Sequence, residues 1–390
     1  PGRSAVAFVE CRRLSMSTPD PTPTPPLVWP DSARAAAFER WLARVAPAHG
    51  LRPETLRLAS ADASFRRYFR LDVDAAHGGG TRIVMDAPPA HEDSRPFVRV
   101  AGLMREAGVC VPQVLDWDEA GGFLLLTDLG TQTLLQALDP QQPDAALPYF
   151  KDAMAALVAW QRASRPGVLP PYDEALLRRE LALFPDWYLA RHKGITLSDA
   201  QRRTLEAAFD LIVQRVLAQP TVWVHRDYMP RNLMLPAGGF DPARPEGRLG
   251  VLDFQDAVHG PLTYDIASLM RDAFLSWDEE VVLDVTIRYW EAARRASLLD
   301  ADGWAQDFGA FYRAVEWMGL QRHLKVAGIF ARLTLRDGKP TYLADAPRFI
   351  AYIRHTAARY RELKPLLQLI DAVEGIETPV AYAFGRPGMS

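Results

Sequence analysis

One stretch in the middle of the chain, VWVHRDYMPRNLML at residues 222–235, spaces its polar residues in a way that suits phosphoryl transfer. Asp227 lies two residues after His225, and Asn232 lies five residues after Asp227. Transfer of a phosphoryl group to a hydroxyl needs a carboxylate near the attacking oxygen and oxygen ligands for Mg²⁺. Because short apolar runs flank the stretch, we expect a tight loop on which Asp227 and Asn232 point into one cleft.

A second carboxylate follows another apolar run, in GVLDFQDAV at residues 250–258. Asp253 is placed there to bind a metal ion that bridges the phosphates, since Mg²⁺ needs only a few hard oxygen ligands besides phosphate oxygens. The alternative is that all these residues are ordinary caps and turn formers. We prefer that bland interpretation for Asp256 and Asp265, because aspartate often caps helices. His225 is expected to be a structural residue that holds the loop.

Composition excludes several classes of protein. The chain has 45 Lys and Arg against 48 Asp and Glu, whereas a nucleic-acid binder is usually basic. Cys11 and Cys110 are its only cysteines, too few for a disulfide framework or a cysteine zinc site. No apolar run approaches the roughly 20 residues that a membrane span needs. We therefore expect a cytoplasmic protein with neither a nucleic-acid nor a membrane partner.

Two groups of elements would position the candidate residues. Residues 1–30 are proline-rich near their end and are expected to form a disordered tail. An amphipathic helix should follow over residues 33–46, behind the N-cap Asp31. Further elements are then expected in the order strand, strand, strand, helix, strand, strand, at residues 55–60, 66–73, 81–87, 94–108, 112–118 and 123–129. This order predicts a small α+β lobe over residues 31–127.

The periodicity is mostly helical from about residue 131 onward. Three long helices are expected at residues 147–164, 173–192 and 198–218. We expect residues 128–390 to form a larger lobe that carries the catalytic residues and binds the phosphate acceptor. The boundary between the lobes is placed at TDLG, residues 127–130.

The motifs HRDYMPRNLM and VLDFQDAVHGPLTYDIA resemble those of the aminoglycoside phosphotransferase and choline kinase superfamily, whose members share the protein-kinase-like fold. The loop of that superfamily often reads H-x-D-x-H-P-x-N. Pro230 and Asn232 match it, and Met229 departs from it at the second histidine. The resemblance covers about residues 35–370 and is strongest between 222 and 270.

This resemblance implies the use of ATP and Mg²⁺ and a two-lobed α+β fold, in which residues 31–127 form the lobe that covers the nucleotide. It implies that Asp227 is the catalytic base and that Asn232 and Asp253 are the metal ligands. It also implies a nucleotide contact through the TDLG segment, whose backbone would meet adenine at Thr127, Asp128 and Leu129.

The chain departs from the superfamily on the third strand, where a basic residue usually anchors the phosphates. IVMDAPP, residues 83–89, puts Asp86 at that place, and no lysine precedes Lys151. A carboxylate repels phosphate, so Asp86 is expected to have a structural role instead.

Replacement for the lysine is expected from DASFRRYFR, residues 62–70, which should form the turn over the phosphates. Backbone N–H groups around Ser64 and Phe65 could cradle a phosphate. Arg66 or Arg67 would then supply the missing charge, with Asp86 holding the guanidinium in place. Strand alternation puts the two arginines on opposite faces but does not say which one serves. The alternative is that both belong to a solvated strand face.

A row of cations follows 3- and 4-residue steps in GLQRHLKVAGIFARLTLRDGKP, residues 319–340; its members are Arg322, Lys325, Arg332 and Arg336. On a helix they would form one stripe, which is either a solvated face or an anion site. Arg231 adds positive charge next to Asn232. We therefore treat Arg231, Arg322 and Lys325 as candidate substrate ligands.

Several segments, among them DASFRRYFR, IVMDAPP and WMGLQRHLKVAGIFARL, are similar to one bacterial branch of the superfamily. That branch contains a kinase that phosphorylates the anomeric hydroxyl of N-acetylmuramate and N-acetylglucosamine with ATP in peptidoglycan recycling. The resemblance therefore implies that this chain is an ATP-dependent kinase of such a small-molecule sugar. The lactyl carboxylate of N-acetylmuramate would suit a cationic site. Two alternatives stay open: a kinase of another small hydroxyl compound, such as an aminoglycoside or an amino alcohol, and a nucleotide-binding pseudokinase.

Overall fold

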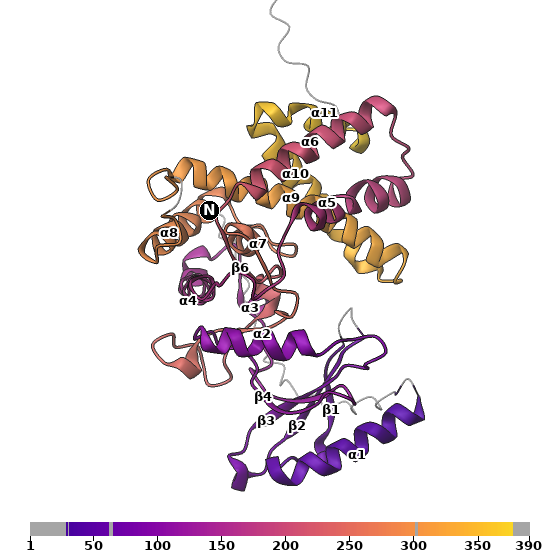
Figure 1. Cartoon of the computed structure of the whole chain (residues 1–390), viewed down its shortest axis with the longest axis vertical. Helices are drawn as coiled ribbons and strands as arrows, with labels where there is room; N and C mark the ends of the chain where they lie inside the picture. The colour runs from indigo at the N-terminus through magenta and orange to yellow at the C-terminus, as the bar shows by residue number, and fades with distance from the viewer. Residues whose placement is uncertain (1–28, 30, 62–64, 301–302, 377–390) are drawn as a thin grey trace, which may run out of the picture.

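The computed structural model describes residues 29, 31–61, 65–300 and 303–376. All of the expected tail except Trp29 lies outside these residues, as does Ser64. Figure 1 shows a sheet that lies between helices α1 and α2, and a larger, mainly helical part beyond α2.

The sheet is built in the order that the sequence predicts. Its strands are β1 (Arg57–Ala61), β2 (Arg67–Asp72), β3 (Thr81–Asp86), β4 (Val114–Asp118) and β5 (Phe123–Thr127). Helix α2 (Arg95–Glu106) is inserted between β3 and β4, and the spatial order is β1-β2-β3-β5-β4 with antiparallel neighbours. Helix α1 (Ser32–His49) precedes the sheet, and its N-cap Asp31 accepts a hydrogen bond from the N–H of Arg34 at 2.7 Å. The predicted α+β class is confirmed.

Both faces of this sheet are covered, which explains the unbroken apolar run FLLL in β5. Phe123 and Leu125 pack in the same cluster as residues of α1, such as Phe38. Leu124 and Leu126 point the other way, toward α2 and the helical part of the molecule. Alternation along one strand therefore serves two hydrophobic cores.

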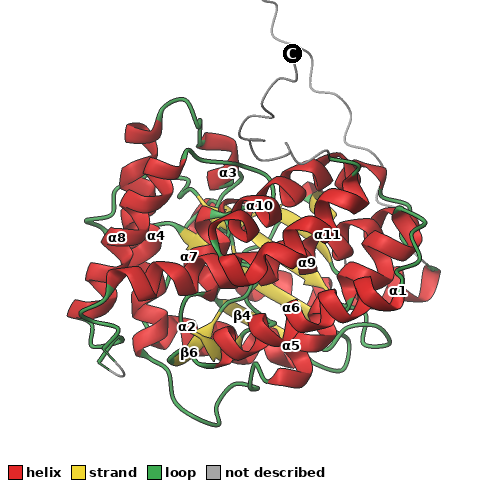
Figure 2. Ribbon diagram, turned by 90° about the horizontal axis from the view of Figure 1, so that it is seen from above, coloured by secondary structure: helices red, strands yellow, loops and turns green. Residues whose placement is uncertain are grey.

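The larger part contains helices and two short sheets, and Figure 2 shows the helices covering the strands. Its helices are α3 (Leu134–Ala137), α4 (Pro143–Arg162), α5 (Glu174–Leu181), α6 (Asp199–Leu217), α7 (Tyr264–Met270), α8 (Glu279–Arg295), α9 (Phe308–Leu335), α10 (Ala346–Arg359) and α11 (Lys364–Glu374). The two-stranded sheets pair β6 (Thr221–Val224) with β9 (Val258–Pro261), and β7 (Leu233–Met234) with β8 (Gly250–Val251). None of the helices described here combines the length and the apolar character needed to cross a membrane.

The helix expected over residues 173–192 is wrong as a single element. Helix α5 ends at Leu181, and a π-helix runs from Phe184 to His192. Pro185 has no N–H to continue the α-helical ladder. Helix α9 also lies so close to this segment that a Cβ atom on Gly328 would overlap the carbonyl group of Leu183. The wider turn thus coincides with a proline and with close packing against a distant helix, and only the proline is visible in a local pattern.

Candidate active site

Asp227, Asn232 and Asp253 lie together at the ends of the short strands of the larger part. The side-chain Nδ2 of Asn232 donates to the backbone oxygen of Asp227 at 2.9 Å and to Oδ2 of Asp253 at 3.4 Å. The other oxygen of Asp253 accepts from Nε2 of Gln255 at 2.8 Å. A single amide therefore connects the loop with the second carboxylate.

The pairing of β7 with β8 places Asp253 beside that loop. Leu233 is paired with Val251, and the N–H of Leu252 donates to the backbone oxygen of Asn232 at 2.9 Å. Asp253 follows directly with a φ of 63°, a left-handed conformation that turns the chain sharply after the strand.

His225 joins the two segments from within the protein. It is fully buried; its Nε2 lies 2.9 Å from the backbone oxygen of Leu252, and its Nδ1 accepts from the N–H of Asp227 at 3.2 Å. Burial lowers the pKa of His225 to about 4, so the imidazole is neutral at pH 7 with its proton on Nε2. This environment suits a structural residue and not a proton carrier.

Asp265 holds the backbone of the loop. Its carboxylate accepts the N–H of His225 at 2.7 Å and the N–H of Arg226 at 3.0 Å, and the side chain is fully buried. Burial raises the pKa of Asp265 to about 7, although these two N–H groups act in the opposite direction. The expectation of an ordinary helix-start residue is corrected, since the carboxylate bonds to a loop 39 and 40 residues away and not to its own helix.

Asp86, at the expected place of a lysine, is enclosed by two arginines. Its Oδ1 accepts from Nε of Arg34 at 2.9 Å, and its Oδ2 accepts from Nε of Arg67 at 3.0 Å; the second nitrogen of each guanidinium bonds to the same oxygen. The Asp86 side chain is fully buried, and the guanidinium of Arg67 lies 4.2 Å above the ring of Trp29. Arg34 was missed by sequence reasoning, because it lies in the first helix, far from any strand motif.

Arg66 has a different environment. Its Nε lies 3.2 Å from Oε2 of Glu92, with only 15% and 16% of the two side chains exposed. Burial opposes the charge of Arg66, but Tyr68, Glu92 and Asp253 raise its pKa overall. Arg66 therefore lies within electrostatic reach of Asp253 while it pairs with Glu92.

Phe65, next to Arg66, is 64% exposed, and its ring stacks on His91 with 4.5 Å between centroids. Asp128 accepts hydrogen bonds from Arg70 and from the hydroxyl of Thr81. The N–H of Thr127 already donates to the backbone oxygen of Gln113 at 3.0 Å.

Leu129 packs against the strand that precedes Asp253. A Cβ atom on Gly250 would lie 2.6 Å from Cδ1 of Leu129. A Cβ atom on Gly130, which has a φ of 115°, would lie 2.8 Å from the backbone oxygen of Leu235. The TDLG segment therefore joins the sheet to the loop that carries the catalytic candidates.

The first two members of the expected cationic stripe, Arg322 and Lys325, are buried, so the stripe as a whole is not a solvated face. Their exposed fractions are 4% and 6%. Nζ of Lys325 donates to the hydroxyl of Tyr264 at 3.0 Å and lies 3.0 Å from a carboxylate oxygen of Glu180. Arg322 donates to the backbone oxygen of Arg226 at 2.6 Å. Both cations face inward because this stretch of α9 packs inside the helical part.

The remaining basic candidates are closer to solvent. Arg336 is exposed and pairs with Asp337, and Arg332 is half-buried. The guanidinium of Arg231 lies 4.8 Å from the ring centroid of Phe274. Phe274 belongs to the loop between α7 and α8.

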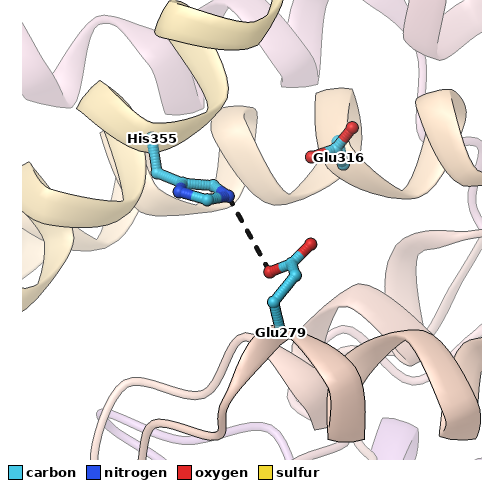
Figure 3. A group of neighbouring side chains, drawn as sticks. All are labelled: Glu279, Glu316 and His355. Carbon is cyan, nitrogen blue, oxygen red and sulfur yellow. Dashed lines mark ion pairs between the residues drawn. The ribbon is translucent and has the colours of Figure 1, made fainter.

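A separate group of Glu279, Glu316 and His355 brings three ligand atoms within 4.8 Å of one another (Figure 3). Glu279 already pairs with Arg271 at 2.9 Å and with Arg359 at 2.8 Å, and Arg359 also reaches Glu316 at 2.9 Å. Because two arginines offset the acids, this group ties helices together and is not a candidate cation site.

Comparison with known proteins gives consistent matches. A family model described as "Phosphotransferase enzyme family" matches residues 55–301. An N-acetylmuramate/N-acetylglucosamine kinase of Pseudomonas aeruginosa is 50% identical, with 88% of this chain and 98% of that protein covered. A protein of the same name from Neisseria meningitidis is 46% identical, with 88% and 97% covered.

Among solved structures, a choline kinase from Cryptosporidium parvum matches with a TM-score of 0.56 at 9% identity, covering 85% of this chain and 99% of that one. The ADP-bound aminoglycoside phosphotransferase APH(2'')-Ib matches with a TM-score of 0.51 at 14% identity, covering 82% and 97%. At these identities the two structures support a shared fold and nothing further.

Proposed function

This chain belongs to the phosphotransferase enzyme family, and we propose that it is an ATP-dependent sugar kinase. The acceptor would be the anomeric hydroxyl of N-acetylmuramate or N-acetylglucosamine, in the cytoplasmic recycling of peptidoglycan. Relatives at 46% and 50% identity over most of the chain carry the name of that kinase. The observation that carries the chemistry is the Asn232 amide, which connects Asp227 with Asp253.

Asp227 would act on the acceptor. The bonds from its N–H to His225 and from Asn232 to its backbone oxygen hold its main chain, which sets the point where its side chain leaves the loop. There it would accept a hydrogen bond from the sugar hydroxyl and take the proton as the new O–P bond forms. In a loose transition state that proton leaves late, so orientation of the hydroxyl contributes most.

Asn232 and Asp253 offer the donor set that Mg²⁺ prefers, an amide oxygen and a carboxylate. Because Nδ2 of Asn232 faces Asp227 and Asp253, its Oδ1 is the atom left to bind a cation. Gln255 donates to Asp253 and fixes the carboxylate from the other side. A bound Mg²⁺ would offset negative charge on the phosphates.

For the phosphate anchor we propose Arg66 and not Arg67. Nε and the second nitrogen of Arg67 bond to the buried Asp86, and its ring contact with Trp29 faces α1. Arg66 acts on Asp253 electrostatically and is paired with Glu92, so its charge lies where a metal-bound phosphate would be. A guanidinium can bind phosphate through two nitrogens.

The remaining contacts follow from position. Asp128 and Leu129 would meet the adenine, since the Thr127 N–H is used within the sheet. The exposed Phe65 would cover the phosphates. Arg231, beside Asn232, is the proposed ligand for an anionic acceptor group such as a lactyl carboxylate.

ADP release with ATP and Mg²⁺ tests this proposal against four acceptors: N-acetylmuramate, N-acetylglucosamine, kanamycin and choline. We expect turnover with the two amino sugars only, and none in the Asp227→Asn variant, which should still bind ATP. Activity confined to kanamycin or choline would support the phosphoryl-transfer mechanism and exclude the amino sugars as acceptors. ATP binding without turnover on any of the four would favour a pseudokinase.

A further inference from the structure

Arg226, the residue before Asp227, has a φ of 79°, a backbone conformation that residues other than glycine rarely adopt. Such a conformation persists only where the surroundings determine it strongly. Its N–H donates to Asp265 and its backbone oxygen accepts from Arg322. Its NH2 group donates to Oε1 of Glu180 at 2.5 Å. Three charged residues from α7, α9 and α5 thus hold one residue of the loop.

Glu180, which accepts from the guanidinium of Arg226, has several other partners. It is 4% exposed, and its carboxylate also accepts from the hydroxyl of Tyr172 at 2.6 Å and from Gln321 at 3.1 Å. Nζ of Lys325 lies 3.0 Å from its Oε1, the atom that Arg226 also binds. Two cations therefore share one carboxylate oxygen.

The electrostatics agree with this geometry. Burial disfavours the ionised form of Glu180, but Lys325 and Arg226, with hydrogen bonds from Tyr172 and Lys325, lower its pKa to about 2. Glu180 is therefore a carboxylate at every pH at which the protein would work. The positive charges of Arg226, Arg322 and Lys325 each interact with Asp227 as well, so this cluster lies directly behind the loop.

We propose that Glu180 is a positioning residue for Asp227: it holds Arg226 in its left-handed conformation, and Lys325 holds Glu180 against the guanidinium. The inference rests on the proposed role of Asp227 and assigns no substrate contact to Glu180 or Lys325. A buried ion pair is weak evidence of stabilisation by itself. Here, however, the cation of the pair is Arg226, which has a positive φ and directly precedes the proposed base Asp227.

The first test is Glu180→Gln, with kcat measured on the amino sugar and the dissociation constant for ATP measured separately. We expect kcat to fall by about 10- to 100-fold, the range associated with a small misplacement of a catalytic group. ATP affinity should stay within about twofold, because none of the partners of Glu180 in the described part of the chain is a proposed nucleotide or metal ligand; these partners are Tyr172, Arg226, Gln321 and Lys325. Unchanged kcat in a folded Glu180→Gln protein would overturn the proposal.

Glu374→Gln is the matched control. Glu374 accepts from the hydroxyl of Tyr188 at 2.9 Å and from Nζ of Lys193 at 2.7 Å, so it has the same kinds of partner as Glu180 without a link to the loop. This variant should lose thermal stability and keep its kcat. An equal loss of kcat in both variants would mean a general effect on the fold and would contradict a positioning role.

A double-mutant cycle asks whether Glu180 acts through Arg226. In an Arg226→Met background, Glu180→Gln should lower kcat no further, whereas full additivity would overturn the proposal. If Glu180→Gln does not fold, the double variant Glu180→Gln/Lys325→Met keeps the net charge of the cluster and should fold with the same low kcat. A folded double variant with wild-type kcat would contradict the positioning role of Glu180.

A crystal structure of the folded Glu180 variant separates this inference from the proposed function. Relaxation of Arg226 to a negative φ, with displacement of the Asp227 carboxylate, supports the inference even if the wild type turns over none of the acceptors. An unchanged Arg226 and Asp227 would overturn it, whatever the substrate.

Discussion

Arg67 and Asp86 are direct partners across β2 and β3, and the guanidinium of Arg67 binds the buried carboxylate of Asp86 through two nitrogens. Arg34 from α1 binds the other oxygen of the same carboxylate. The position that would carry a phosphate-binding lysine thus carries the acid of an internal ion cluster. Asp86 thus connects β2, β3 and α1 through these two arginines, and a cation for a bound phosphate would have to come from another residue.

Replacing Asp86 by Asn should destabilise the protein strongly, because two partly buried guanidinium groups lose the buried carboxylate that they share. Loss of one member of a buried pair costs about 3–5 kcal/mol. Urea unfolding would measure the change in the free energy of unfolding. Glu291→Gln, which removes the exposed i,i+4 pair with Arg295, is the control and should cost about 0–1 kcal/mol. Equal costs at the two sites would contradict the buried-cluster interpretation.

Arg66→Ala should weaken ATP binding by about 10- to 100-fold, as expected for a hydrogen bond to a charged group worth about 1.5–3 kcal/mol. Adenosine has no phosphates, so its affinity should not change. Calorimetric titration with both ligands measures the difference, and Arg66→Lys should recover part of it. Arg67→Ala is the matched control, which should lower stability and weaken ATP and adenosine alike. A selective loss of ATP affinity in Arg67→Ala, and none in Arg66→Ala, would reverse the assignment.

His323→Gln should flatten the pH dependence of stability on the acid side of neutrality. His323 is fully buried, and burial, together with the charges of Arg271 and Arg322, lowers its pKa to about 3. As pH falls below about 6.5, the unfolded chain gains a proton at this residue that the folded chain does not accept. The wild type therefore loses stability through His323 over that range, by up to about 1.4 kcal/mol per pH unit.

In the Gln variant this contribution is absent, while a hydrogen bond to the backbone oxygen of Arg271 can be kept. Urea unfolding of both proteins at pH 5, 6 and 7 provides the comparison. Identical slopes would show that the imidazole is protonated inside the fold.

Gly328→Ala should destabilise the protein by about 1–3 kcal/mol through overpacking, since the new methyl group meets the backbone of Leu183 and not a movable side chain. Gly319→Ala in the same helix is the control. Its Cβ would meet its nearest atom, on His323, at 3.7 Å, an ordinary contact. That variant should be neutral or more stable, by roughly 0.5–1 kcal/mol for glycine in a helix. Thermal unfolding of both variants distinguishes the two sites.

The sequence by itself determined the features that depend on neighbours along the chain. Short segments specify the spacing of Asp227 and Asn232 between apolar strands, the apolar run before Asp253, and the succession of three strands, a helix and two strands along the chain. Alternation and turn residues specify such segments locally, so they could be predicted without knowing what packs against them.

Only the tertiary structure decided which charges face which. Nothing in the pattern of residues 62–70 distinguishes the surroundings of Arg66 from those of Arg67. Arg67 shares its carboxylate partner with Arg34 and lies above the ring of Trp29. Arg66 pairs with Glu92 and interacts with Asp253. The same limit applies to Arg322, which bonds to a residue 96 positions away. A row of cations in a helix looks alike whether it faces water or the interior. The burial of such a row is set by contacts between distant segments, which have no periodicity along the chain.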